Sequence, residues 1–282
     1  MKFSIYQDTD IGGRPVNQDR MGYAFTRECL LMLVADGMGG HLRGEIAAQV
    51  AMQSIAATFQ REARPALADP ARFLERALRR AHDEILACPA IHGLPEAPRT
   101  TVVACVVQGE NAWWAHAGDS RACWIRDGAM LARTRDHSRV ETLLAMGLLQ
   151  PDEAAVHPDR NKLYNCLGSP AEPQIELAQA EGLREGDLLL LCSDGVWGAV
   201  SEAELLRVLS LGPVQQAVPE LVRRSVSAGG RFADNATALA MRWEGGVDAE
   251  RVAVAPPPEG AVTTSIAFGR TGESAERLNS GP

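Results

Sequence analysis

The sequence contains the apolar run Leu31-Met32-Leu33-Val34-Ala35-Asp36-Gly37, and Leu189-Leu190-Leu191-Cys192-Ser193-Asp194-Gly195 repeats its pattern. A continuous apolar run of this length, ended by Asp-Gly, indicates a strand that is buried on both faces. A carboxylate at the end of such a strand would lie at the rim of the core. The glycine after it allows a sharp turn or a close backbone approach to a ligand.

Asp-Gly on its own is also ordinary turn chemistry. Asp127-Gly128, between two polar-flanked segments, is therefore interpreted as a hairpin turn. Asp119, at the end of an apolar strand, and Asp234, just before the last strand, extend the first pattern. Several carboxylates near one another at a core are costly to desolvate unless cations compensate them. Oxygen ligands without His or Cys clusters favour Mg²⁺ or Mn²⁺ over zinc.

The remaining periodicity predicts groups of strands interrupted by pairs of helices. Strands are expected over residues 3–10, 29–35, 187–192 and 237–242, an antiparallel meander over 100–107, 112–117, 120–126 and 129–134, and helices over 44–60, 70–87, 202–209 and 214–227. Asp69 is the expected N-cap of the second helix, and Ser138 starts a capping box. This order predicts an α+β layered domain with helices outside packed antiparallel sheets.

Composition narrows the class of protein. The net charge of −8 argues against a nucleic-acid binder. The first residues lack the apolar core of a secretory signal, and no run approaches the roughly 20 apolar residues of a membrane span. The 6 cysteines are scattered, as in a reduced protein, so we expect a cytoplasmic location. After Trp243 the apolar content falls, and we expect residues 244–282 to be a disordered tail.

A set of short motifs then occurs in a familiar order. They are Gly13-Arg14-Pro15-Val16-Asn17-Gln18-Asp19, Val34-Ala35-Asp36-Gly37-Met38-Gly39-Gly40-His41, Gly44-Glu45, Ala117-Gly118-Asp119-Ser120-Arg121, Asp136-His137-Ser138, Ser193-Asp194-Gly195-Val196-Trp197 and Asp234-Asn235-Ala236-Thr237. In this order the sequence resembles the PPM family, the protein phosphatase 2C-type metal-dependent serine/threonine phosphatases, and most closely their bacterial branch. The resemblance covers about residues 3–243, which we expect to form the catalytic domain.

The resemblance implies a four-layer α-β-β-α sandwich of two antiparallel sheets flanked by helix pairs. It also implies roles in binding two Mn²⁺ or Mg²⁺ ions and a weaker third. Asp36 would bridge two ions, the Gly37 carbonyl would bind one of them, Asp19 would serve one directly or through water, Asp194 and Asp234 would hold the other, and Asp119 with Asp194 would form the third site. Arg14 would clamp the substrate phosphate, and a hydroxide bridging the metals would attack phosphorus.

The proton donor is left open. Some family members carry His at the position of Met38, and Met has no proton to donate. Water on a third ion near Asp119 is the preferred donor, and His41 is a second candidate. Gln18 stands where some relatives carry an acid, and we expect it to accept a hydrogen bond from metal-bound water.

The segment from about residue 138 to 168 corresponds to the flap of bacterial relatives. Its polar residues either contact the phosphoprotein or form a solvated surface: His157, Arg160, Asn161 and Asn165. Asp136 and Ser138 are expected to cap the helix that follows them, and His116 is expected to be a core residue.

The expected function is hydrolysis of phosphoserine and phosphothreonine in proteins, opposite a bacterial serine/threonine kinase. We expect a monomer with no nucleic-acid or membrane partner. Two alternatives come from other classes: a pseudophosphatase that serves as a scaffold or binding module, and another two-metal hydrolase such as a nuclease. Retention of all five aspartates argues against the first, and the acidic charge argues against the second.

Overall fold

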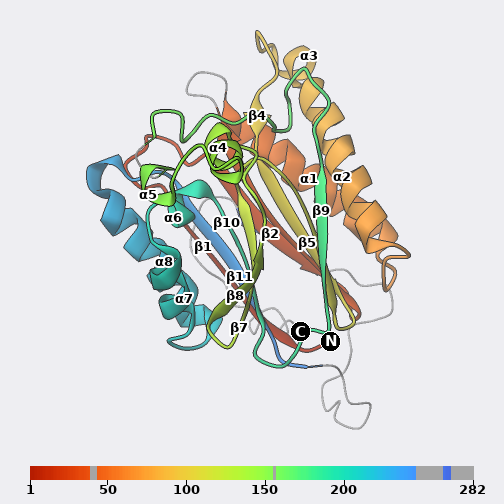
Figure 1. The fold of residues 1–282 in the computed structure, drawn as a ribbon. Coiled ribbons are helices and arrows are strands. Elements are labelled where there is room, and N and C mark those ends of the chain that lie inside the picture. The colour runs from red at the N-terminus through yellow and green to blue at the C-terminus, as the bar shows by residue number, and fades with distance from the viewer. Residues whose placement is uncertain (39–42, 155–156, 246–262, 268–282) are drawn as a thin grey trace.

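The computed structural model describes residues 1–38, 43–154, 157–245 and 263–267, and it consists of two antiparallel sheets packed face to face (Figure 1). The smaller sheet contains, in spatial order, β1 (Phe3–Asp10), β11 (Ala236–Trp243), β10 (Leu188–Cys192), β7 (Arg121–Arg126) and β8 (Ala129–Arg133). The larger sheet contains β12 (Thr263–Ala267), β2 (Asp19–Phe25), β3 (Cys29–Met38), β5 (Val102–Gln108), β6 (Asn111–Ala117) and β9 (Glu176–Glu181), while the short β4 (Arg99–Thr100) pairs with the end of β3.

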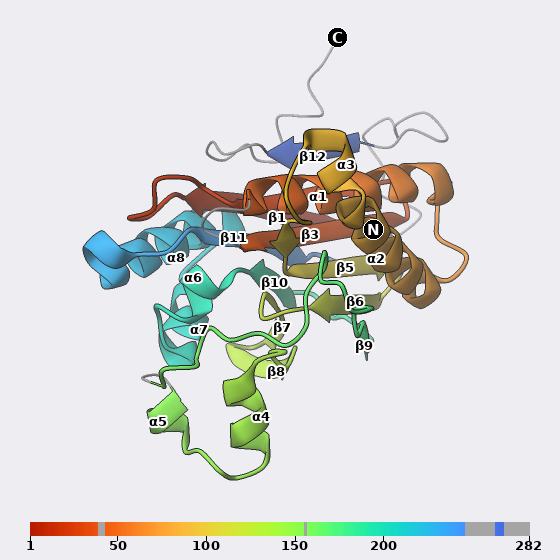
Figure 2. The ribbon, with the colours of Figure 1, turned by 90° about the horizontal axis from the view of Figure 1, so that it is seen from above.

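Helices cover the outer faces of both sheets (Figures 1 and 2). The larger sheet carries α1 (Gly44–Glu62) and α2 (Pro70–Leu86), and the smaller sheet carries α7 (Glu202–Leu209) and α8 (Val214–Gly229). The shorter helices are α3 (Cys88–His92), α4 (Arg139–Ala145), α5 (Pro151–Ala154), α6 (Asp194–Trp197) and a 3-10 turn at Gly230–Phe232. The predicted four-layer α-β-β-α sandwich is confirmed, and α4 and α5 project from it as the flap (Figure 2).

The two apolar runs are buried on both faces, as their sequences predict. In β3, Leu31 and Leu33 pack toward α1 and α2. Leu30, Met32 and Val34 pack into the layer between the sheets. In β10, Leu189 points into that central layer and Leu190 packs against α7 and α8. Strands that contact core on both sides have no polar face, which explains why the runs are continuous.

The predicted meander is wrong in one respect, because its strands belong to different sheets. β5 pairs with β6 in the larger sheet, and β7 pairs with β8 in the smaller one. The chain crosses between the sheets at Gly118, whose φ of 114° is a conformation that glycine adopts readily. Strand and turn patterns do not tell which sheet a strand joins. The hairpin turn at Asp127-Gly128 is confirmed, with φ of 52° and 75° at its two residues.

Part of the predicted disordered tail is a strand. β12 pairs antiparallel with β2, from Thr263 opposite Phe25 to Ala267 opposite Met21. Its pairing depends on an edge strand more than 200 residues away, so the local composition of the tail gives no sign of it. Residues 246–262 and 268–282 of the tail lie outside the described residues.

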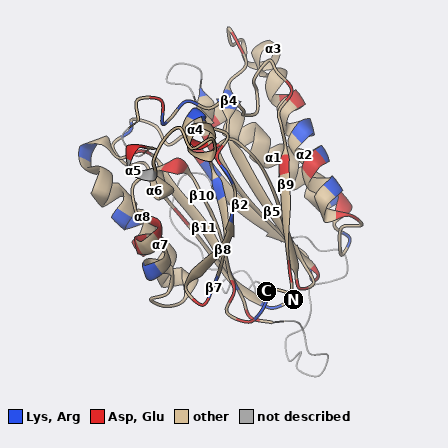
Figure 3. Cartoon of the chain, in the orientation of Figure 1, with Lys and Arg blue, Asp and Glu red and all other residues tan. Residues whose placement is uncertain are grey.

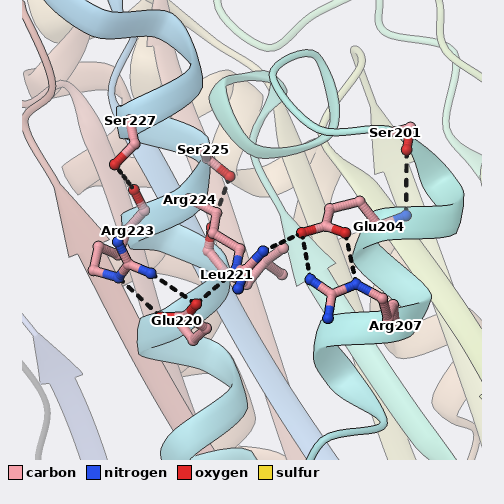
Figure 4. Close-up of polar contacts among 9 residues, drawn as sticks. All are labelled: Ser201, Glu204, Arg207, Glu220, Leu221, Arg223, Arg224, Ser225 and Ser227. Atoms are coloured by element: carbon pink, nitrogen blue, oxygen red, sulfur yellow. Dashed lines mark hydrogen bonds and ion pairs between the residues drawn. The ribbon is translucent and has the colours of Figure 1, made fainter.

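Charged residues of both signs recur along the outer helices, whereas long stretches of the strands between them carry none (Figure 3). Arg224 of α8 forms ion pairs with Glu220 on its own helix and with Glu204 on α7, which ties the two helices together (Figure 4). Glu204 and Glu220 each also bind a second arginine on their own helix. None of the helices within the described ranges combines the length and apolar character that a membrane span requires.

The start of α1 lies directly against the end of β3. A Cβ atom at Gly44 would fall 2.4 Å from the carbonyl carbon of Gly37, and one at Gly37 would fall 2.3 Å from the carbonyl carbon of Gly44. Two backbones can approach this closely only where both residues lack side chains. This contact holds the end of β3, directly after Asp36, against the start of α1.

We therefore expect Gly44→Ala to lower the free energy of unfolding by about 1–3 kcal/mol, since backbone must move to admit the methyl group. Urea denaturation measures the loss. Gln53→Ala, at an exposed position of the same helix, is the matched control and should change stability by less than about 0.5 kcal/mol. Equal stability of the two variants would contradict the close contact.

Candidate active site

A cavity of about 510 Å³ opens at one end of the sandwich, and it gathers most of the predicted site residues. Asp36, Asp119, Asp194 and Asp234 line it together with Arg14. These residues come from the ends of strands and the loops after them, in both sheets. Asn161 and Leu163 of the flap and Arg43 and Glu45 at the start of α1 complete the wall.

Asp19 and Asp36 lie directly opposite each other on the paired strands β2 and β3. Asp19 is 3% exposed, and its Oδ2 accepts a hydrogen bond of 2.7 Å from the hydroxyl of Ser193. Its Oδ1 is buried and has no hydrogen-bond partner among the described residues. The main chain of Asp36 is fixed on both sides by Thr101, whose N–H donates to the Asp36 carbonyl and whose hydroxyl accepts from the Asp36 N–H.

Asp194 and Asp234 are brought together by two segments of the smaller sheet. Asp194 begins α6 just after β10, and Asp234 precedes β11. A Cβ atom at Gly195 would fall 2.0 Å from the carbonyl oxygen of Asn235, so the two acidic segments touch through their main chains. Arg14 donates from Nη2 to Oδ2 of Asp234 at 2.7 Å. The predicted phosphate clamp therefore lies at the edge of the carboxylate group.

Asp119 is held by Trp197, whose indole N–H donates to the Asp119 carbonyl at 2.9 Å. The guanidinium of Arg121 stacks 3.6 Å from the Trp197 ring centroid and makes two hydrogen bonds, of 2.8 and 2.7 Å, to Asp136. The expectation that Asp136 caps the next helix is therefore wrong: it neutralises a nearly buried arginine. Ser138 does cap α4, since its hydroxyl accepts from the Glu141 N–H.

Burial and mutual repulsion change the acidity of these groups. Burial, with the nearby carboxylates, raises the pKa of Asp36 and Asp119 well above the usual range. Burial likewise raises the pKa of Asp194 to about 6, although a hydrogen bond with Asp36 opposes the shift. Burial raises the pKa of Asp19 to about 7, although the hydrogen bond from Ser193 opposes the shift. Without cations, the cavity resists full ionisation at neutral pH.

The residues present fit divalent cations. The donors are carboxylate oxygens with a nearby main-chain carbonyl, the set that Mg²⁺ and Mn²⁺ prefer. Asp19 Oδ1 is an acceptor that is removed from water and has no hydrogen-bond partner in the part of the chain that the structure describes, and such an atom is costly unless a ligand completes it. A cation near these groups would also remove the repulsion that raises their pKa values.

Several residues that shape the cavity have partners that the sequence does not predict. Asn235 accepts from the Gln18 N–H and donates to the carbonyls of Ile11 and Val16, so it joins the Arg14 loop to β2. The side-chain amide of Gln18 donates to Glu45 at 3.2 Å. Asn235 and Glu45 both belong to motifs that the sequence shows, so their importance could have been predicted. Their hydrogen-bond partners could not, because those partners are distant in sequence.

The flap residues separate into two groups. Asn161 lines the cavity, in agreement with a contact to substrate. Asn165 is buried and turned inward, where its side-chain amide bonds both main-chain groups of Gln174. His157 accepts from the Asp159 N–H within the flap. His116 is 1% exposed, as expected for a core residue, and His41 lies outside the described residues.

Comparison with known proteins agrees with this architecture. A family model described as protein phosphatase 2C matches residues 10–220. The chain is 34% identical over 227 residues to the serine/threonine protein phosphatase PstP of Mycobacterium tuberculosis, covering 80% of this chain but only 42% of PstP. It is 33% identical over 230 residues to protein phosphatase PhpP of Streptococcus pneumoniae, covering 79% of this chain and 91% of PhpP.

A solved structure is similar over the same region. The crystal structure of the PstP catalytic domain in complex with two manganese ions has a TM-score of 0.71 and 29% identity, covering 86% of this chain and 99% of that chain. The two-sheet sandwich with flanking helices is the fold of PPM phosphatases. The chain belongs to the protein phosphatase 2C family, and the relatives found for it are bacterial serine/threonine phosphatases.

The raised pKa values predict how the metal-free protein depends on pH. A carboxyl whose pKa is raised on folding stabilises the native state fully below its unfolded value, here 3.8 for Asp19, and loses that contribution as pH rises through about 7. Chelator-treated protein should therefore lose stability between about pH 4 and pH 8. Asp19→Asn should remove part of the decline and be more stable than the parent at pH 8 by about 1–3 kcal/mol.

Chemical denaturation across that pH range, with and without added Mn²⁺, measures the effect. Mn²⁺ should restore the parent protein at pH 8 more than it restores Asp19→Asn. A parent and variant with the same pH dependence would show that Asp19 ionises normally in the native protein.

Proposed function

We propose that this chain hydrolyses phosphoserine and phosphothreonine in proteins with a dinuclear Mn²⁺ or Mg²⁺ centre. Asp36 would bridge the ions, with Asp19 and the Gly37 carbonyl serving one, and Asp194 and Asp234 the other. Asp119 with Asp194 would hold a weaker third ion. The substrates would be products of a serine/threonine kinase, in keeping with the names of the relatives.

The observation that carries the proposal is that Asp36, Asp119, Asp194 and Asp234 line one cavity with Arg14, while the buried Asp19 lies directly opposite Asp36. Asp19 and Asp36 are paired in register, and Asp194 perturbs both of them electrostatically. Such repulsion is rarely kept for stability, whereas pKa values perturbed together in a cleft are common at functional sites. A scaffold without catalysis would have no need of it, and no observation favours that alternative.

The protein's own residues would bind and orient the phosphate. Bound divalent ions would supply a water of lowered pKa at this site. Arg14 is half exposed at the mouth of the cavity, so its guanidinium can offer parallel N–H donors to two phosphate oxygens. Its present partner, Asp234, is a proposed metal ligand. A cation on Asp234 would compete for that carboxylate and favour transfer of Arg14 to the phosphate.

The residues that line the cavity bear on which group donates a proton to the leaving hydroxyl. Met38 lines the cavity and has no acidic proton. The described residues around the cavity include no histidine. Water on an ion near Asp119 therefore stays the preferred proton donor, and His41, which lies outside the described residues, stays the second candidate.

Asp36→Asn should reduce Mn²⁺-dependent turnover by at least about 10³-fold, because an amide cannot bridge two cations as a carboxylate does. Release of phosphate from a phosphothreonine peptide measures turnover, and circular dichroism checks the fold. Met38→Ala, at a neighbouring position of the same cavity wall, is the control and should change turnover less than about threefold. Substantial turnover by folded Asp36→Asn would refute the bridging role.

Arg14→Ala should lower kcat/KM by roughly 10²-fold, since it removes donors to a phosphate whose charge develops in the transition state. Arg14→Lys keeps the charge but not the planar pair of donors, so it should recover only part of the loss. Steady-state kinetics at saturating Mn²⁺ separate this effect from metal binding. Full activity of Arg14→Lys would show that charge alone is required.

A further inference from the structure

A second group of titratable side chains lies beside the candidate active site. His116, His137 and Glu176 each place a ligand atom within 4.8 Å of the others. His116 and Glu176 are directly opposite on β6 and β9, and the rings of His116 and His137 stack with centroids 4.4 Å apart. Two histidines and a carboxylate are a common set for zinc, so a metal site is the first interpretation to test.

The hydrogen bonds of His137 exclude that interpretation. Its Nδ1 accepts from the Gly118 N–H at 3.1 Å and from the side-chain amide of Asn165 at 2.6 Å. The Asn165 amide cannot be turned around, because its other bonds are to the N–H and the carbonyl of Gln174. Nδ1 therefore carries no hydrogen, and in the neutral ring Nε2 carries it and points to Glu176 at 3.4 Å. A protonated nitrogen is no metal ligand.

His116 is fixed in the same way. Its Nε2 lies 2.7 Å from the carbonyl of Arg135, which can only accept, so the proton is on Nε2. Its Nδ1 is left as a buried acceptor that has no hydrogen-bond partner within the described ranges. Burial lowers the pKa of both histidines, which keeps the rings neutral and His137 Nδ1 available as an acceptor. One free nitrogen does not make a metal site.

His137 joins the base of the flap to the segment that carries Asp119. Its N–H donates to the Gly118 carbonyl while its ring accepts from the Gly118 N–H, so both main-chain groups of Gly118 are bound to one residue. The carbonyl of His137 accepts from the N–H of Tyr164, at the far end of the flap. Ser138 and Leu163 then form an antiparallel bridge, so the two ends of the flap leave the sandwich side by side.

Gly118 has little freedom to relax apart from these bonds. A Cβ atom there would fall 2.6 Å from the Cβ of Thr101, and the hydroxyl of Thr101 lies 2.7 Å from that of Ser120. Asp119 therefore stands between two tightly held neighbours. Asp119 and His137 are therefore linked through Gly118 by short main-chain contacts.

We propose that His137 is a positioning residue that couples the flap to Asp119, with its Nδ1 joining the Asn165 amide to the Gly118 N–H. The link from the flap through His137 to the segment of Asp119 follows from the hydrogen bonds of His137 and does not require a bound metal. The consequence for catalysis rests on the proposed function, through the weaker ion assigned to Asp119.

Two substitutions distinguish the nitrogens of His137. In His137→Asn the amide oxygen can occupy the place of Nδ1 and keep both donors satisfied. In His137→Gln the longer side chain places its amide near the position of Nε2. We expect His137→Gln to speed hydrogen exchange by about tenfold or more in peptides covering residues 116–121 and 157–165, and His137→Asn to stay within about threefold of the parent.

Asn165→Ala provides a second route that leaves the histidine in place. It removes the flap side of the junction, and it should speed exchange in residues 116–121 although they are distant in sequence. These measurements use metal-free protein and do not depend on the proposed function. Exchange that rises only around residue 165, or His137→Asn behaving like His137→Gln, would overturn the coupling.

Activity supplies the second readout. His137→Gln should raise the Mn²⁺ concentration for half-maximal turnover by about tenfold, with p-nitrophenyl phosphate and with a phosphothreonine peptide alike, and His137→Asn should restore it. A change confined to the KM of the peptide would mean that His137 holds only the flap, and would overturn the link to Asp119. A parent protein without Mn²⁺-dependent turnover would refute the proposed function, while hydrogen exchange still decides the coupling.

Titration with Co²⁺ alone tests the excluded metal site. A d–d absorption band that disappears in both His116→Ala and Glu176→Ala would show that the group binds metal and would overturn the hydrogen-bond assignment. No such band is expected, because His137 Nε2 carries a proton.

Discussion

The carboxylates held close together at the edge of the apolar core repel one another, and the surrounding structure has to offset this repulsion. Asp19 and Asp36 face each other across neighbouring strands, an arrangement that destabilises a sheet when both are charged. Burial, together with this repulsion, raises the pKa of Asp36 well above its usual range. A chain selected for stability alone would not keep it. In the proposed function, the stability lost to this repulsion would be the cost of a site that can bind cations.

The fold holds these carboxylates in place with groups from other segments. Ser193 follows a strand of the smaller sheet, yet it donates to Asp19 at the start of a strand in the larger sheet. Trp197 similarly fixes the Asp119 main chain from the segment that begins with Asp194. Because the partners come from both sheets, neither sheet holds the site alone. The packing of the sandwich is what brings the ligand atoms together.

The sequence predicted those elements whose signals lie in the pattern of neighbouring residues. The apolar runs gave β3 and β10, and the Asp69 cap gave the start of α2, since each signal lies within a few residues of the element. The group of aspartates was predictable because motifs preserve order along the chain. The crossing at Gly118 and the pairing of Asp136 with Arg121 were not, because both are set by contacts that only the folded chain makes.

The flap and the sandwich differ in how firmly they are held. Met146 and Leu148 are 66% and 70% exposed, so the body of the flap buries little apolar surface and its local stability is low. Its base, by contrast, is bound at His137 to a glycine that backbone geometry and Thr101 hold rigid. The flap therefore meets the sandwich at a junction that it shares with Asp119 through Gly118. Contacts of the flap with a phosphoprotein would then act on the one aspartate whose neighbour shares the base, and the remaining carboxylates, fixed by the sandwich, would stay in place.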